Sequence, residues 1–125
     1  MHLIRTAALA ALTALAAAPV VAQAQGGDAA KGADVYEGRC SSCHVLNGVG
    51  QGPSLIGVVG RKAGSLPGYA YSDAMKASGL TWTAADLNRF LTGPSILVPG
   101  TAMRATVPDP TERQDLIAYL ATLKR

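Results

Sequence analysis

Beyond residue 24 the chain has few of the residue types that bind metals or fill large cores. It contains two cysteines, Cys40 and Cys43, and one histidine, His44. It also has only one Trp, one Phe and four Tyr. A chain of about a hundred residues already has difficulty burying enough surface for stability. We therefore expect some additional group to fill the centre of the fold.

Clusters of positive charge are also lacking. After residue 24, four Lys and six Arg are scattered among eight Asp and Glu, which gives a formal charge of +2. Proteins that bind nucleic acid generally gather their Lys and Arg into patches that contact phosphates. The sequence therefore argues against a nucleic-acid partner.

The only long apolar run lies at the N-terminus. Arg5 precedes an uncharged, mostly Ala and Leu run over Thr6–Ala22, and small residues at Ala22 and Ala24 suit a cleavage site. This pattern is typical of a secretory signal peptide, and it is weaker than a membrane-spanning helix. We predict a signal peptide over residues 1–24, a periplasmic location, one domain over residues 25–125 and no membrane span after cleavage.

Strand-like alternation is absent from this domain, whereas helix signals are present. A side chain that can cap a helix precedes each expected helix. Asp109 is followed by a proline, which suits the first position of the last helix. The expected helices are 29–40 after Asp28, 73–77 after Ser72, 84–91 after Thr83, and one that starts after Asp109 and runs toward the C-terminus. The predicted class is all-α, with about four helices.

Two long segments are rich in glycine and proline. Residues 47–68 contain seven Gly and two Pro, and residues 93–108, which include Met103, have no helical period. Long ordered loops in a small domain usually have a function. Apolar residues at 55, 56, 58 and 59 favour a loop that wraps around a ligand.

The segment Cys40-Ser41-Ser42-Cys43-His44 matches the C-x-x-C-H pattern of c-type haem attachment. Two thiols three positions apart can reach both vinyl groups of one porphyrin edge, and the adjacent imidazole can then bind the iron. A structural zinc site would need four protein ligands, but only three Cys and His side chains are available. A redox dithiol would be expected in a βαβ unit, and a plain disulfide would leave His44 without a role.

The second axial ligand of such an iron cannot be another histidine, because His2 lies in the predicted signal peptide. Met103, Met75, a Lys and water are the alternatives. Met103 is favoured because it follows Pro99 and Gly100 in a non-helical segment, where proline stiffens the backbone and glycine permits close approach. Met75 lies in a short expected helix, where a methionine more often fills a gap in the core.

Taken together, these motifs resemble the class I c-type cytochromes, including mitochondrial cytochrome c and its short bacterial relatives. The resemblance extends from Gly27 to the C-terminus. The matching segments are 40–44, 52–55, 57–61, 69–75, 79–82, 99–103 and 112–120. It implies the cytochrome c fold, long loops wrapped around one covalent haem c, and electron transfer without enzymatic activity.

The resemblance also implies roles for single residues. The Pro53 carbonyl would hold the His44 ring, and His44 and Met103 would bind the iron. The haem propionates would be hydrogen-bonded or neutralised by Arg61, Tyr71, Trp82 and Thr101. The first and last helices would cross, with Gly32 and Tyr36 against Leu116 and Tyr119.

The sequence departs from the family pattern at four places. Phe90 stands where a Tyr often hydrogen-bonds the ligand sulfur, so a modified iron–sulfur bond is expected. Ala102 replaces a Lys of the basic docking ring, and Arg104-Ala105 replaces an aromatic that covers the haem edge. The eight residues of 45–52 form a shorter connection than in mitochondrial proteins, which suggests a bacterial form.

The resulting hypothesis is a monomeric, periplasmic one-electron carrier. It would accept electrons from a membrane complex or a dehydrogenase and pass them to an oxidase or a reductase. A second hypothesis is an electron-accepting subunit of a periplasmic oxidoreductase complex, because the weakened basic ring reduces charge steering. A haem enzyme or gas sensor with an open coordination site is a third, and a methionine ligand argues against it.

Overall fold

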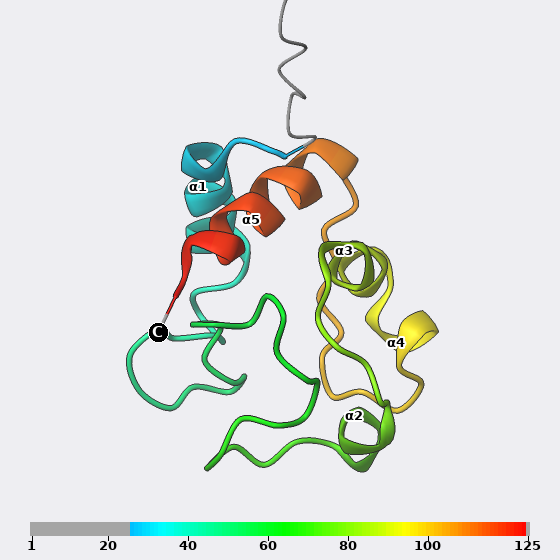
Figure 1. Cartoon of the computed structure of the whole chain (residues 1–125). Helices are drawn as coiled ribbons and strands as arrows, with labels where there is room; N and C mark the ends of the chain where they lie inside the picture. Colours follow the sequence, from blue (N-terminus) through cyan, green and yellow to red (C-terminus); the bar gives the residue numbers. More distant parts are fainter. Residues whose placement is uncertain (1–25, 125) are drawn as a thin grey trace, which may run out of the picture.

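A computed structural model describes residues 26–124, so the predicted signal peptide lies outside the described residues. The five helices of this part are α1 (Ala29–Arg39), α2 (Asp73–Ala77), α3 (Ala84–Thr92), α4 (Pro94–Leu97) and α5 (Pro110–Thr122) (Figure 1). Within residues 26–124 there is no named β-strand, only one isolated bridge between Lys62 and Thr81. The all-α prediction is confirmed. None of the helices described is long and apolar enough to cross a membrane.

The four predicted helix starts are confirmed, and a side-chain oxygen caps each of them. Asp28 accepts hydrogen bonds from the backbone N–H groups of residues 30 and 31. Ser72, Thr83 and Asp109 each accept one from the residue three positions later. The first N–H groups of a helix have no partner within it, so these oxygens stabilise the starts.

The expectation of an unbroken loop over residues 93–108 is wrong, because α4 begins at Pro94 directly after α3. Proline cannot continue α3, but it fits the first position of a new helix because it needs no N–H there. The backbone N–H of Val98 donates to the Pro94 carbonyl over 2.8 Å and closes this short turn. The fold therefore has five helices in the described residues, not about four.

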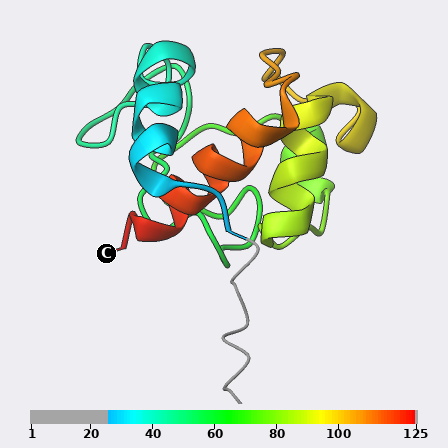
Figure 2. The ribbon, with the colours of Figure 1, turned by 90° about the horizontal axis from the view of Figure 1, so that it is seen from above.

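The first and last helices cross at a close contact (Figure 2). A Cβ atom added to Gly32 would lie 1.9 Å from the Asp115 backbone oxygen, so only glycine allows this approach. The rings of Tyr36 and Tyr119 pack with centroids 5.4 Å apart, and the Asp28 N–H donates to the Asp115 carboxylate over 2.6 Å. The predicted crossing of these helices is confirmed.

The apolar side chains of α5 and its C-cap are only partly buried. Leu116 and Leu120 are buried, whereas Ile117 and Leu123 are half-buried. The two buried leucines line the interior of the molecule beside the side chains of α3 and of the long loop. This part of α5 therefore forms one wall of the central region.

The long loop after α1 is ordered by backbone hydrogen bonds to the other elements. Gly57 N–H donates to the Leu123 carbonyl over 2.6 Å, and Gly60 N–H donates to the Trp82 carbonyl over 2.8 Å. In return, Trp82 N–H donates to the Arg61 carbonyl over 2.9 Å. These bonds bring the loop round the lower part of the molecule (Figure 1). Pro53, Leu55 and Val58 of this loop line a central cavity.

Candidate cofactor site

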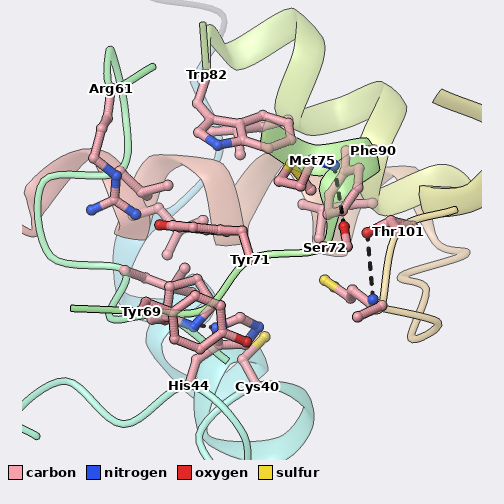
Figure 3. Close-up of a pocket in the computed structure, with 18 of the residues that line it drawn as sticks. Cys40, His44, Arg61, Tyr69, Tyr71, Ser72, Met75, Trp82, Phe90 and Thr101 are labelled. Carbon is pink, nitrogen blue, oxygen red and sulfur yellow. Dashed lines mark hydrogen bonds between the residues drawn. The ribbon is translucent and has the colours of Figure 1, made fainter. Parts of the chain in front are cut away.

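The central cavity has about 850 Å³ of empty space, part of it open to solvent. Its lining comes from the end of α1, both long loops, α2, α3 and α5 (Figure 3). Most of the lining is apolar: Leu55, Val58, Met75, Trp82, Leu87, Phe90, Leu91, Leu116 and Leu120. Binding pockets for organic molecules are mostly apolar, with a few polar groups that fix the orientation of the ligand. The cavity suits a flat, largely apolar cofactor.

The end of α1 brings Cys40 and His44 to the cavity wall. The Cys40 N–H donates to the Tyr36 carbonyl over 2.8 Å and ends the helix, and the His44 N–H then donates to the Cys40 carbonyl over 2.8 Å. Cys43 does not line the cavity; its thiol donates to the Gln51 side-chain oxygen over 3.3 Å. The other eight predicted cofactor-binding residues all line the cavity.

The His44 ring is held in one orientation. Its Nδ1 lies 2.9 Å from the Pro53 carbonyl oxygen, so the contact implied by the family resemblance is present. A Cβ added to Gly52 would lie 2.4 Å from the ring, which means that the ring packs directly on the backbone. The Tyr36 hydroxyl donates to the His44 carbonyl. Because the Pro53 carbonyl can only accept, Nδ1 carries the proton and the lone pair of Nε2 is left to bind a metal, the arrangement usual for a metal-binding histidine.

Burial raises the pKa of the Cys40 thiol to about 11, and Cys43 adds to this rise while Arg39 opposes it. Charged thiolate is unfavourable in the apolar wall of the cavity. Before any bond forms at its sulfur, Cys40 is therefore a neutral thiol at physiological pH, and it faces the cavity.

The four residues predicted to contact propionates all line the cavity, namely Arg61, Tyr71, Trp82 and Thr101. The Arg61 guanidinium donates to two backbone carbonyls, at residues 54 and 56, both over 3.1 Å. The Tyr71 hydroxyl accepts from the residue-66 N–H over 3.2 Å, so its own proton is available to a further acceptor. Figure 3 shows Arg61 and Trp82 at the side of the cavity away from Cys40.

Both methionines considered as iron ligands line the cavity. Met75 is buried in α2, and Met103 is half-buried in the segment after α4. The Met103 N–H donates to the Thr101 hydroxyl over 3.4 Å. In Figure 3, Met75 lies beside Trp82 and Phe90. Met75 thus occupies the packed position expected of a core methionine.

Two polar cavity residues were missed as site residues. The Tyr69 hydroxyl donates to the Gln51 carbonyl over 2.6 Å, and the rings of Tyr69 and Tyr71 pack edge to face 4.7 Å apart. Ser72 lines the cavity while capping α2. The spacing of Tyr69 and Tyr71 was a usable signal, because side chains two positions apart in extended backbone point the same way.

Comparisons with known proteins agree with this geometry. Residues 29–124 match the family model for cytochrome c. A cytochrome c2 from Rhodomicrobium vannielii is 48% identical over 100 residues, covering 77% of this chain and 79% of that protein. A cytochrome c from Euglena viridis is 46% identical over 101 residues, covering 78% and 99%. The chain belongs to the cytochrome c family.

Among solved structures, cytochrome cH from Methylobacterium extorquens has a TM-score of 0.73 and 50% identity, covering 77% of this chain and 99% of that chain. The cytochrome c fold predicted from the sequence is confirmed. As a member of this family, the chain carries covalently attached haem c and is a monohaem electron carrier. The apolar cavity, with a cysteine and an oriented imidazole in its wall, fits that cofactor.

The departures from the family pattern fall at the cavity and beside it. Phe90 lines the cavity and packs on Trp82, with ring centroids 4.9 Å apart. It offers no hydroxyl there. Ala102 and Arg104, on either side of Met103, are exposed. Of residues 102–104 in this cytochrome c, only Arg104 places a positive charge on the surface next to Met103.

Proposed function

We propose that this cytochrome c is a periplasmic one-electron carrier whose haem is bonded to Cys40 and Cys43 and whose iron is ligated by His44 and Met103. The main support is the orientation of the His44 ring. With Nδ1 on the Pro53 carbonyl and the ring packed on Gly52, its Nε2 is the nitrogen left to bind iron at the cavity wall.

Haem attachment would use the thiols described above. Each thioether forms by addition of an S–H across a vinyl group, so that sulfur bonds one vinyl carbon and the hydrogen goes to the other. The neutral Cys40 thiol already faces the cavity, whereas the Cys43 thiol would exchange its hydrogen bond with Gln51 for the thioether. The three-residue spacing allows both bonds within one turn of chain.

The bound haem iron supplies one-electron chemistry between its ferric and ferrous forms. His44 and Met103 would occupy both axial positions, which leaves no open position for oxygen or another substrate. A thioether ligand favours ferrous iron and raises the reduction potential relative to two nitrogen ligands. This coordination supports a role in electron transfer without catalysis.

The cavity's polar side chains would stabilise the propionates. A carboxylate in an apolar cavity is costly unless charges or hydrogen bonds compensate it. Arg61 supplies a fixed positive charge at the lining, while Tyr71, Trp82 and Thr101 offer hydroxyl and indole donors. Together they would keep the haem in one orientation.

The carrier would be exported by the signal peptide at residues 1–24 and would act as a monomer. Its electron donor would be a membrane complex or a dehydrogenase, and its acceptor an oxidase or a reductase. N-terminal sequencing of protein from a periplasmic extract tests the export step. A first residue at or close to Gln25 supports it, and an intact Met1 in the haem-bearing protein contradicts it.

The axial methionine is tested by two matched variants, Met103→Ala and Met75→Ala. Met103→Ala is expected to abolish the far-red sulfur-to-iron charge-transfer band of the ferric protein while the haem stays attached. Met75→Ala removes a buried side chain and should cost about 2–5 kcal/mol of stability without abolishing the band. If Met75→Ala abolishes the band and Met103→Ala does not, the ligand assignment is wrong. Rapid carbon monoxide binding to the reduced wild type at neutral pH would also contradict it.

A second candidate function is an electron-accepting subunit of a periplasmic oxidoreductase complex. It is favoured by Ala102, which is exposed beside Met103 at a position where the family often has a Lys of the basic docking ring. Transient docking relies on charge steering, which the loss of this Lys weakens. Gel filtration of a native periplasmic extract distinguishes the two, since stable co-elution with a larger enzyme would support the subunit and exclude the free carrier.

A further inference from the structure

One arginine of α5 connects three parts of the structure. Arg113 donates from Nε to the Asn88 side-chain oxygen of α3 over 2.8 Å. Its Nη1 donates to two successive backbone carbonyls, those of Val107 and Pro108, both over 2.8 Å. A single guanidinium therefore joins α5, α3 and the end of the segment that carries Met103.

The segment around Met103 has little burial of its own. Residues 104–106 are exposed, and Met103 itself is half-buried. On the N-terminal side, the Thr101 N–H donates to the Val98 carbonyl over 3.0 Å. On the C-terminal side, Val107 is buried and its N–H donates to the Leu91 carbonyl over 2.8 Å. The position of Met103 therefore depends on anchors a few residues to either side.

Arg113 is suited to be the C-terminal anchor. Its contacts with Val107 and Pro108 lie four and five residues beyond Met103, at the point where the exposed stretch returns to the core. Hydrogen bonds from a charged donor are stronger than neutral ones. The guanidinium is also a rigid planar fork, which a lysine ammonium cannot replace at the same three acceptors.

We infer that Arg113 is a positioning residue for the axial methionine: by holding residues 107 and 108 against α3, it keeps the Met103 sulfur on the haem iron. This inference rests on the proposed ligation by Met103. It assigns Arg113 no contact with the haem. Its effect is on how readily the iron–sulfur bond opens, which sets how well the ferric form resists other ligands.

The test is imidazole binding to the ferric protein at neutral pH, followed by loss of the far-red band. Imidazole can bind only where the sulfur has left, so its apparent affinity reports the population with an open iron. Arg113→Gln is expected to raise that affinity about tenfold, which corresponds to about 1.4 kcal/mol. Arg113→Lys keeps the positive charge but loses the planar fork of donors, so it should give most of this increase. Asn88→Ala should give a smaller increase in the same direction.

The matched control is Arg39→Gln. Arg39 pairs with Glu112 over 2.8 Å, so this variant removes an arginine contact that joins α5 to α1, whereas the bonds to residues 107 and 108 come from Arg113. It should lower unfolding free energy without changing imidazole affinity. If Arg39→Gln and Arg113→Gln raise imidazole affinity in equal proportion to their loss of stability, Arg113 is merely structural and the inference is overturned.

The two proposals fail in different ways. If the wild type has no far-red band, or Met103→Ala retains it, ligation by Met103 is wrong and the inference about Arg113 falls with it. If the band depends on Met103 but Arg113→Gln, Arg113→Lys and Asn88→Ala all bind imidazole as the wild type does, only the role of Arg113 is wrong. Should Arg113→Gln fail to fold, the other two variants decide the matter.

Discussion

The two sides of the cavity are built differently. On the histidine side, His44 lies in the turn that follows α1. Its ring packs on Gly52 and bonds the Pro53 carbonyl, and Tyr36 donates to its backbone oxygen. On the methionine side, Met103 lies in a segment whose next three residues are exposed. The histidine is held by direct contacts to its ring and backbone, whereas the methionine is held by hydrogen bonds of residues a few positions away in the sequence.

This difference predicts which iron ligand should dissociate first. A ring packed on the Gly52 backbone and bonded to the Pro53 carbonyl cannot move without disturbing that segment. A side chain on a partly exposed segment can leave when the segment shifts, and such segments open at a lower free-energy cost than the core. The histidine side should therefore resist substitution until the fold itself fails, while the methionine side should respond to small local changes.

The largest effect should follow from Gly52→Ala, which attacks the histidine side. The new Cβ would lie 2.4 Å from the His44 ring, so the ring or the backbone must move. We expect a severe loss of holoprotein, measured as covalent haem per polypeptide after expression with the maturation machinery. Gly38→Ala is the control, because nothing lies within 4 Å of its Cβ and alanine favours helix by about 1 kcal/mol. Normal haem content in Gly52→Ala would contradict the tight packing described for His44.

A moderate effect is expected from Gly100→Ala on the methionine side. Gly100 has φ +91°, a backbone conformation that costs other residues roughly 1–2 kcal/mol, and its added Cβ would lie 3.1 Å from the Ala74 side chain. The haem should still be attached, but imidazole should bind the ferric form more tightly. Gly79→Ala is the matched control, with φ +68° and open space around the Cβ. If the two variants bind imidazole with equal affinity, the effect of Gly100→Ala comes from backbone strain that any such glycine would give, and not from its place in the segment that carries Met103.

The smallest effect is expected from Tyr36→Phe. Loss of the hydroxyl that donates to the His44 carbonyl should lower the unfolding free energy by about 1 kcal/mol at neutral pH, with both iron ligands retained. Chemical denaturation at neutral pH, followed by far-UV circular dichroism, checks this. A variant that loses its far-red band while His44 stays bound would show that the two sides are coupled through Tyr36.

The same variant carries a pH signature. Burial raises the pKa of the Tyr36 phenol, and Tyr119 adds to the rise. A raised pKa in the folded state means that this stabilisation is fully present below the unfolded value of about 10 and is lost as the pH rises through the folded value. Wild-type stability should therefore fall more steeply than that of Tyr36→Phe above pH 10. Parallel curves for the two proteins would contradict the assignment.

Much of this architecture could be predicted from the sequence because its signals are local. Asp28, Ser72, Thr83 and Asp109 are capping residues at fixed spacings from their helices, and a cap depends only on nearby backbone. Gly32 was expected at the crossing of the first and last helices from the family resemblance, and the structure shows that only a residue without a Cβ fits there. The haem motif is likewise contained within five consecutive residues.

What the sequence did not predict depends on the surroundings of each residue. Pro94 looked like the end of regular structure, yet with Gly93 before it the same proline begins α4. The direction of the Cys43 thiol is set by Gln51, and no spacing rule gives it. The role inferred for Arg113 requires α3, α5 and residues 107 and 108 to meet, and they come together only in the folded chain.

X-ray absorption at the iron edge of the ferric wild type and of Met103→Ala measures which atoms ligate the iron. Ligation by His44 and Met103 predicts one sulfur atom among nitrogen ligands in the wild type and none in Met103→Ala, with haem attached in both. A wild type with only nitrogen or oxygen ligands, or a Met103→Ala protein that keeps its sulfur, would contradict it.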